Sequence, residues 1–112
     1  MKNVVIIIQP NKFDNVRKKL IEAGVCGMTV TNVEGFGYEK KQMKVSKAQE
    51  MTIELSPKIR IEIAVRDDEV EGVINAAVGE ARTGRLSDGK IFISDLSEVI
   101  RIRTGERGEH AV

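Results

Sequence analysis

The sequence predicts one α+β domain, in which a single antiparallel sheet carries two helices on one of its faces. Two observations lead to this fold class. Each half of the chain contains a strand–helix–strand pattern, because the apolar residues change from short continuous or alternating runs to helical spacing and back again. The chain has 112 residues, 41% apolar and 31% charged, which suits one globular core rather than two. Two such halves in succession are typical of a ferredoxin-like βαββαβ sandwich spanning residues 1–112.

The first half begins with a continuous β-branched run at residues 4–8, which predicts a strand buried on both faces. Pro10 interrupts this run, and Asn11 is a candidate helix N-cap. Gly24 is placed to end the helix in a left-handed conformation, and residues 28–33 are Thr- and Val-rich like a second strand. The apolar face of the helix between them consists of Phe13, Val16, Leu20 and Ile21.

The second half repeats the pattern. Apolar and polar residues alternate at 59–65, which predicts a half-exposed strand. Asp68 and Glu71 resemble a capping box, and Gly84 is expected to stop the helix that follows. Further strands are expected at 90–94 and, as a short addition, at 99–104. The expected helical stripe consists of Val70, Val73, Ile74, Ala77, Val78 and Ala81.

Two features indicate that the domain does not act alone. The run at 4–8 is apolar on both sides, yet two helices cover only one face of a sheet, so we expect a homo-oligomer that buries the other face. The two halves are joined by about twenty residues at 37–57, longer than most loops in compact domains. The segment is interpreted as an arm that meets a partner; a disordered insertion is the alternative.

Charge and rare residues exclude several function classes. Lys and Arg number 18 and Asp and Glu 17, so general attraction to nucleic acid or to an anionic membrane is not expected. Cys26 is the single cysteine and His110 the single histidine, which excludes an intrachain disulfide and argues against a Cys/His zinc site. Cys26 is expected to be a small buried residue. Apolar runs are too short to span a bilayer, so we expect a cytoplasmic protein.

Several weak anion-binding signals occur together. The turn at 85–90 combines a glycine, a lysine and backbone N–H groups, as anion-binding turns do. Arg101 and Arg103 lie two apart in a segment expected to be extended, which would point both guanidinium groups to one side. The glycines of 35–37 allow close approach of the backbone to a ligand, and Lys58 opens the next strand. Together these features predict nucleotide binding.

Other functions find less support in the sequence. No catalytic constellation is visible, since His110 lies in the tail and Cys26 has no base near it in the sequence. The adjacent acids at 67 and 68 suit a helix N-terminus better than catalysis. Residues 34–38 faintly echo the strand signature of RNA-binding modules but begin with an acid and lack a second aromatic set. An RNA-binding module and a small phosphohydrolase on the same fold are therefore remote alternatives.

The most specific motifs are IRIRTGERGE at 100–109 and DGKIF at 88–92. ARTG at 81–84, GMTVT at 27–31 and GFG at 35–37 accompany them. With these motifs the whole chain resembles the PII nitrogen-regulatory signal proteins. The resemblance implies a homotrimer with ATP or ADP between neighbouring subunits, a T-loop at 37–57 and a C-terminal tail at 104–112. The matching nucleotide-binding positions are Thr29, Gly35, Gly37, Tyr38, Lys58, Glu62, Ala64, Leu86, Ser87, Asp88, Gly89, Lys90, Phe92, Arg101 and Arg103.

The resemblance also implies partners. In the family the T-loop responds to ATP, ADP and 2-oxoglutarate and docks on targets such as ammonium channels and nitrogen-metabolism enzymes. The expected activity is therefore regulatory and not enzymatic, with contact to a membrane only through a partner and no contact with nucleic acid. A ligand that orders the base of the loop selects among its conformations, and the partner binds one of them.

The chain departs from the family in and near this loop. Met51 replaces the usual uridylylated tyrosine, which excludes that modification, and Ser46 is at most a speculative phosphorylation site. Glu39 replaces a glutamine that binds Mg²⁺ in the 2-oxoglutarate complex; its charge predicts weak or absent 2-oxoglutarate binding. Lys40 and Lys58 are the other candidate effector contacts. Tyr38 replaces an arginine, and Ser87 replaces a glycine, a mild change if its φ is negative.

These departures leave a second interpretation open. A divergent paralogue would sense adenine nucleotides alone, or another small effector, and would have a different partner.

Overall fold

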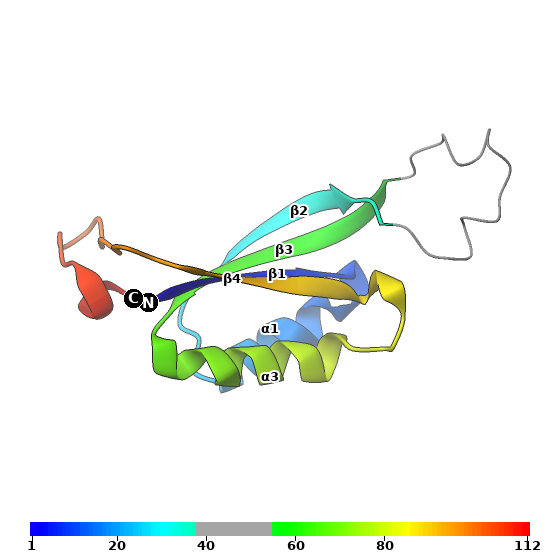
Figure 1. Cartoon of the computed structure of the whole chain (residues 1–112), viewed down its shortest axis with the longest axis horizontal. Coiled ribbons are helices and arrows are strands. Elements are labelled where there is room, and N and C mark those ends of the chain that lie inside the picture. Colours follow the sequence, from blue (N-terminus) through cyan, green and yellow to red (C-terminus); the bar gives the residue numbers. More distant parts are fainter. Residues whose placement is uncertain (38–54) are drawn as a thin grey trace, which may run out of the picture.

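The computed structural model describes residues 1–37 and 55–112. The predictions made for Tyr38, Glu39, Lys40, Ser46 and Met51 lie outside these residues. In the described part, β1 (Lys2–Ile8), β2 (Thr29–Gly35), β3 (Ser56–Val65) and β4 (Gly89–Asp95) form one sheet. Helices α1 (Phe13–Glu22) and α3 (Val70–Ala81) lie together on one face of that sheet (Figure 1). The predicted α+β, ferredoxin-like fold is confirmed.

The sheet has the order β2-β3-β1-β4, and each neighbouring pair is antiparallel. Strand β1 lies inside the sheet, where Ile6 stands opposite Ile61 on one side and Ile91 on the other. Every second residue of β1 faces the helices, as the period of two requires. These are Val4, Ile6 and Ile8, all of which are buried.

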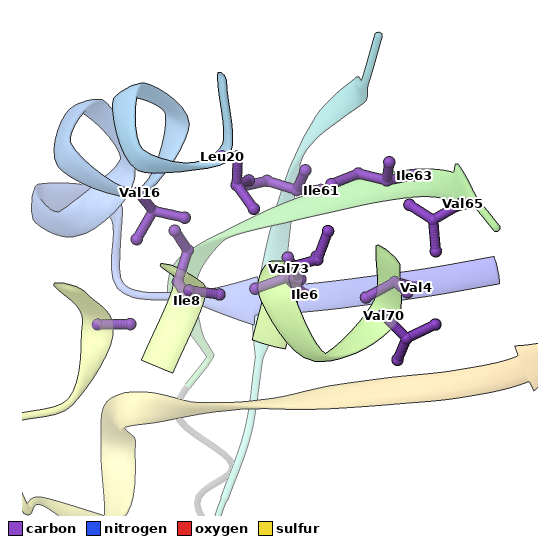
Figure 2. Packing of buried hydrophobic residues seen from close by; sticks show 12 residues of the cluster. Val4, Ile6, Ile8, Val16, Leu20, Ile61, Ile63, Val65, Val70 and Val73 are labelled. Carbon is purple, nitrogen blue, oxygen red and sulfur yellow. The ribbon is translucent and has the colours of Figure 1, made fainter. Parts of the chain in front are cut away.

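The core fills the space between this face and the helices. Figure 2 shows Leu20 of α1 beside Ile61 of β3 and Val73 of α3 close to Ile6, and Val16 of α1 belongs to the same cluster. Each of these five side chains is at most 2% exposed. Burying one such aliphatic side chain contributes about 1.5–3 kcal/mol relative to leaving it exposed. The core therefore fixes the sheet on which the site described below is built.

Strand β1 is not buried on both faces, contrary to the sequence expectation. Val5 and Ile7 lie on the helix-free face and are half-buried. Both helices occupy the opposite face, so nothing in the described chain covers these two side chains fully. Val5 and Ile7 of β1 thus lie on a face of the sheet that the single chain leaves partly exposed to solvent.

The entry to α1 differs from the prediction. A 3-10 turn, Pro10–Lys12, precedes the helix, and Asn11 caps nothing. Gln9 occupies the cap position of that turn without a capping side chain. At the other end Gly24 has φ +100°, which confirms the left-handed glycine. Ile21 is 54% exposed and lies outside the core, so the predicted apolar face was one residue too wide.

The ends of α3 are also set by other residues than those predicted. The Arg66 N–H donates to Glu69 Oε1 at 3.1 Å, and the Glu69 N–H donates to the Arg66 carbonyl at 3.0 Å. This reciprocal pair replaces the expected pair of Asp68 and Glu71. Helix α3 ends at Ala81, and the next residue, Arg82, is extended. Gly84, with φ +90°, comes only after this end and therefore does not terminate the helix.

Two further expectations were wrong. Cys26 is exposed and not buried; its thiol lies 3.5 Å from the Gly24 carbonyl oxygen. Residues 99–104 form a turn in place of a strand, since the Gly105 N–H donates to the Arg101 carbonyl at 2.7 Å. A single bridge, Ile100 to Arg107, is the only β pairing described there. No extended strand therefore aligns Arg101 with Arg103 in this described segment.

Candidate functional site

The helix-free face of the sheet collects six of the predicted site residues. Phe92 stands opposite Val5, Val5 opposite Glu62, and Glu62 opposite Thr29, so one row crosses all described strands. Residues two apart on a strand share a face, which places the other members beside this row. The six are Thr29, Lys58, Glu62, Ala64, Lys90 and Phe92.

The turn between α3 and β4 is fixed by a carboxylate. Asp88 accepts hydrogen bonds from the Thr83 N–H at 2.6 Å, the Gly84 N–H at 2.8 Å and the Thr83 hydroxyl. The bond from the Thr83 hydroxyl, followed by those from the backbone, lowers the pKa of Asp88. The N–H groups of Thr83 and Gly84 thus bind the Asp88 carboxylate, and these hydrogen bonds fix the shape of the turn.

Gly89 brings this turn against β1. Its φ is +116°, and a Cβ there would lie 1.8 Å from the Ile7 carbonyl oxygen. No other residue fits such an approach. Ser87 needs no such freedom. In the described chain only glycines have a positive φ, so the φ of Ser87 is negative and a serine side chain is tolerated there.

Ser87 links the turn to β3 and to the residue that follows β1. Its carbonyl oxygen accepts the Gln9 amide at 2.8 Å and the Lys58 ammonium at 3.1 Å. Both contacts are partly buried. Gln9 was not predicted as a site residue, because a contact across 78 positions leaves no trace in local sequence.

Lys58 also lies close to Gly35, the last residue of β2. A Cβ on Gly35 would lie 3.1 Å from Lys58 Cγ, so the missing side chain makes room for the lysine stem. Lys58 stands opposite Val33 in β2, and Gly35 opposite Ser56 where β3 begins. Ser56 belongs to the segment 37–57, so the strand starts inside the region expected to be loop.

Arg60 lies on the same face and was also missed. Its Nη2 donates to Glu62 Oε2, and both side chains are about one-third exposed. The alternation of Lys58, Arg60 and Glu62 would have placed them on one face, and this signal was available in the sequence. Glu62 is therefore a charge-paired acceptor and not an isolated carboxylate.

The predicted arginines lie at the other end of the sheet. The C-terminal segment extends from the end of the sheet that carries the chain termini, while β2 ends and β3 begins at the opposite end (Figure 1). Arg101 is held there by its own tail, with Nη2 3.2 Å from the His110 carbonyl oxygen and Nη1 3.6 Å from Glu106 Oε2. Arg103 lies exposed in the neighbouring turn.

The predicted site residues are thus divided between two ends of the sheet. We call Gly35, Lys58 and residues 87–90 the Lys58 end, and Ala64, Arg101 and Arg103 the Arg101 end. Lys58 and Ala64 are six residues apart on β3, about 20 Å at ~3.3 Å per residue. The C-terminal segment lies beyond the end of β3 that carries Ala64 (Figure 1). The two groups of cations therefore lie far apart within the single chain.

The side chains of both groups have the chemistry to bind a phosphate-bearing ligand. The Lys58 end carries two lysines and a glycine turn, and the Arg101 end carries two arginines, a set suited to phosphate oxygens. Thr29 and Glu62, between the ends, offer a hydroxyl and a carboxylate for polar atoms of a sugar or base. An apolar groove of about 400 Å³ lies between α3 and β4; its lining includes Asp88, Gly89 and Lys90 of the Lys58 end, but neither Lys58 nor Glu62.

Two negative findings apply to residues 1–37 and 55–112. No helix there combines the length and apolarity needed to cross a membrane. No group of three or more His, Cys, Asp or Glu side chains there is arranged to hold a metal ion. The predicted magnesium contact, Glu39, lies outside these ranges.

Comparison with known proteins gives a consistent result. Residues 1–106 match the family model described as nitrogen regulatory protein P-II. Nitrogen regulatory protein P-II of Mesorhizobium japonicum is 47% identical over 112 residues, and nitrogen regulatory protein P-II 1 of Escherichia coli is 45% identical; both alignments cover the whole of each chain. A crystal structure of Arabidopsis thaliana PII bound to citrate is 40% identical, with a TM-score of 0.80, and the match covers 99% of this chain and 91% of that one.

Proposed function

Because the chain belongs to the nitrogen regulatory protein P-II family, we propose that it is a non-enzymatic sensor that binds ATP or ADP between copies and regulates a target protein. The family is one of nitrogen-regulatory signal-transduction proteins. The proposed assembly is a homotrimer in the cytoplasm. Residues 37–57 act as the T-loop and 104–112 as the tail. The proposed targets are a nitrogen-metabolism enzyme or an ammonium channel.

The observation that carries this proposal is the division of the site between the Lys58 end and the Arg101 end. Neither end alone offers all the cations of the predicted site. Closed symmetry would bring the two ends of neighbouring copies together at each interface. The half-buried Val5 and Ile7 and the exposed Phe92 on the helix-free face supply apolar area for that interface.

The choice of an anionic ligand has support from charge. Lys58, Lys90, Arg101 and Arg103 are four cations at the predicted positions, and Arg suits bidentate contact with phosphate. The related Arabidopsis protein is bound to citrate, an anion with three carboxylates. The nucleotide would supply phosphate charge, and these side chains would bind and orient it. Mg²⁺ with the nucleotide is part of the proposal through Glu39, while 2-oxoglutarate is expected to bind weakly.

Calorimetry tests the proposal directly. We expect saturable binding of ATP and ADP, weaker after Arg101→Ala and Arg103→Ala together, with the effects of Mg²⁺ and 2-oxoglutarate measured in parallel. Sedimentation of the same samples reports the trimer. Absence of nucleotide binding by the unaltered protein at millimolar concentration would overturn the proposed function.

A second candidate within the family follows from the residues that differ from it. Tyr38, Glu39 and Met51 stand where signalling contacts are expected, which favours a paralogue with another effector or partner. Capture of partners from native lysate with ATP or ADP present distinguishes the two. A nitrogen-metabolism enzyme or ammonium channel supports the first candidate, and an unrelated partner the second.

A further inference from the structure

The strongest unassigned feature of the Lys58 end is the shared acceptor on Ser87. One carbonyl oxygen receives a neutral amide, Gln9 Nε2 at 2.8 Å, and a charged ammonium, Lys58 Nζ at 3.1 Å. A carbonyl has two lone pairs, so both bonds form together. The donors come from separate parts of the sequence, Gln9 directly after β1 and Lys58 within β3.

The two donors differ in what an anion does to them. Lys58 carries a full charge on a flexible stem and has three N–H donors, so a nearby phosphate or carboxylate attracts it strongly. Gln9 is neutral, and its amide gains less from the same anion. An anion at the Lys58 end would therefore attract Lys58 more strongly than Gln9.

Loss of Lys58 alone does not release the turn, provided that Gln9 stays. Ser87 lies in the 3-10 turn Leu86–Asp88, which leads directly into Gly89 and the close contact with Ile7. If the Ser87 carbonyl lost both partners, a half-buried acceptor would be left unsatisfied, which is costly. Gln9 prevents that outcome.

We propose that Gln9 is a positioning residue, which holds the Ser87 carbonyl so that Lys58 is free to bind an anionic ligand. The inference rests on the proposed function, because it takes the ligand to be a nucleotide phosphate or similar anion at the Lys58 end. Without Gln9, the turn depends on Lys58, and the ligand must compete with the turn for the ammonium group.

The test variant is Gln9→Met, which keeps the length of the side chain and removes the donor. Asn11→Ala, two positions on in the exposed 3-10 turn, is the matched control. Amide hydrogen exchange of residues 86–90 is measured without ligand, and ATP affinity by calorimetry. We expect faster exchange in Gln9→Met and an ATP affinity lower by about 3- to 10-fold, as the loss of one hydrogen bond predicts. Asn11→Ala should change neither.

A double variant separates anchoring from a general loss of stability. Lys58→Met alone should leave exchange at 86–90 nearly unchanged, since Gln9 remains, and Gln9→Met with Lys58→Met should raise it by more than the product of the single effects. Multiplicative effects would overturn the inference.

The affinity measurements distinguish the inference from the proposed function. Unaltered ATP affinity in Gln9→Met, with the unaltered protein binding normally, would overturn the inference and leave the proposed function standing. Faster exchange with unchanged affinity would make Gln9 merely structural and would overturn it as well. If the unaltered protein bound no nucleotide, both would fall.

Discussion

Asp88 receives both the backbone N–H and the side-chain hydroxyl of Thr83, which closes the turn between α3 and β4 around one carboxylate. These bonds favour the charged form and lower the pKa of Asp88 below its ordinary value of 3.8. Because the pKa in the folded protein lies below that of the unfolded chain, the carboxylate contributes stability above pH 3.8. That contribution disappears as the pH falls through the lowered pKa.

The first prediction follows from this shift. Asp88→Asn should lower the melting temperature by a constant amount between pH 7 and about pH 5, and the difference from the unaltered protein should shrink below about pH 4. Thermal unfolding followed by circular dichroism across this range checks it. Asp14→Asn, an exposed carboxylate of α1, controls for the loss of one negative charge. A difference that stays constant down to pH 3 would contradict the assignment.

The second prediction concerns Gly89. Gly89→Ala places a Cβ against the Ile7 backbone at a φ of +116°, so the turn or β1 must move. We expect a loss of about 3 kcal/mol or more in the free energy of unfolding, measured with urea. Gly79→Ala is the control, since its Cβ meets nothing within 4 Å and lies inside α3. There alanine should stabilise by about 0.5–1 kcal/mol through helix propensity.

The third prediction uses adjacent residues of α1. Leu20 is 0% exposed and Ile21 is 54% exposed. Leu20→Ala should cost about 2–5 kcal/mol of unfolding free energy, because it leaves a cavity in the core. Ile21→Ala should cost under about 1 kcal/mol in the isolated subunit, as expected for a surface position. A large loss for Ile21→Ala that depends on protein concentration would instead place Ile21 in an interface.

The sequence predicted the elements better than their ends. The central parts of strands and helices follow from the spacing of apolar residues. This is why a strand at residues 4–8 and a helix with an apolar stripe from Val70 to Ala81 were predicted correctly, although the burial of both faces of that strand was not. Caps depend on which backbone groups come within reach. Residue type favours Asn11 and Asp68 as caps, whereas the cap positions fall at Gln9 and Arg66. The run at 99–104 resembles a strand locally, but Gly105 and Gly108, both with positive φ, turn the chain back.

The site shows the same division. The even spacing of Lys58, Glu62 and Ala64 along β3 is enough to place them on one face of the sheet. The contact of Gln9 with Ser87 and the separation of Arg101 from Lys58 arise only when distant segments fold together. Residue types therefore predicted an anion site, while its division between two ends required the fold.

The last prediction tests that division. A variant with Lys58→Met and Lys90→Met disables the Lys58 end, and a variant with Arg101→Ala and Arg103→Ala disables the Arg101 end. Each alone should bind ATP much more weakly than the unaltered protein. If every site combines the Lys58 end of one copy with the Arg101 end of the next, random mixed assemblies should recover about one quarter of the sites.

Calorimetry after denaturing and refolding the two variants together measures this fraction, with each variant refolded alone as the control. Binding that stays at the level of the separate variants would place the whole site within one chain, and the separation of about 20 Å along β3 would then have to be bridged by a rearrangement of the C-terminal segment.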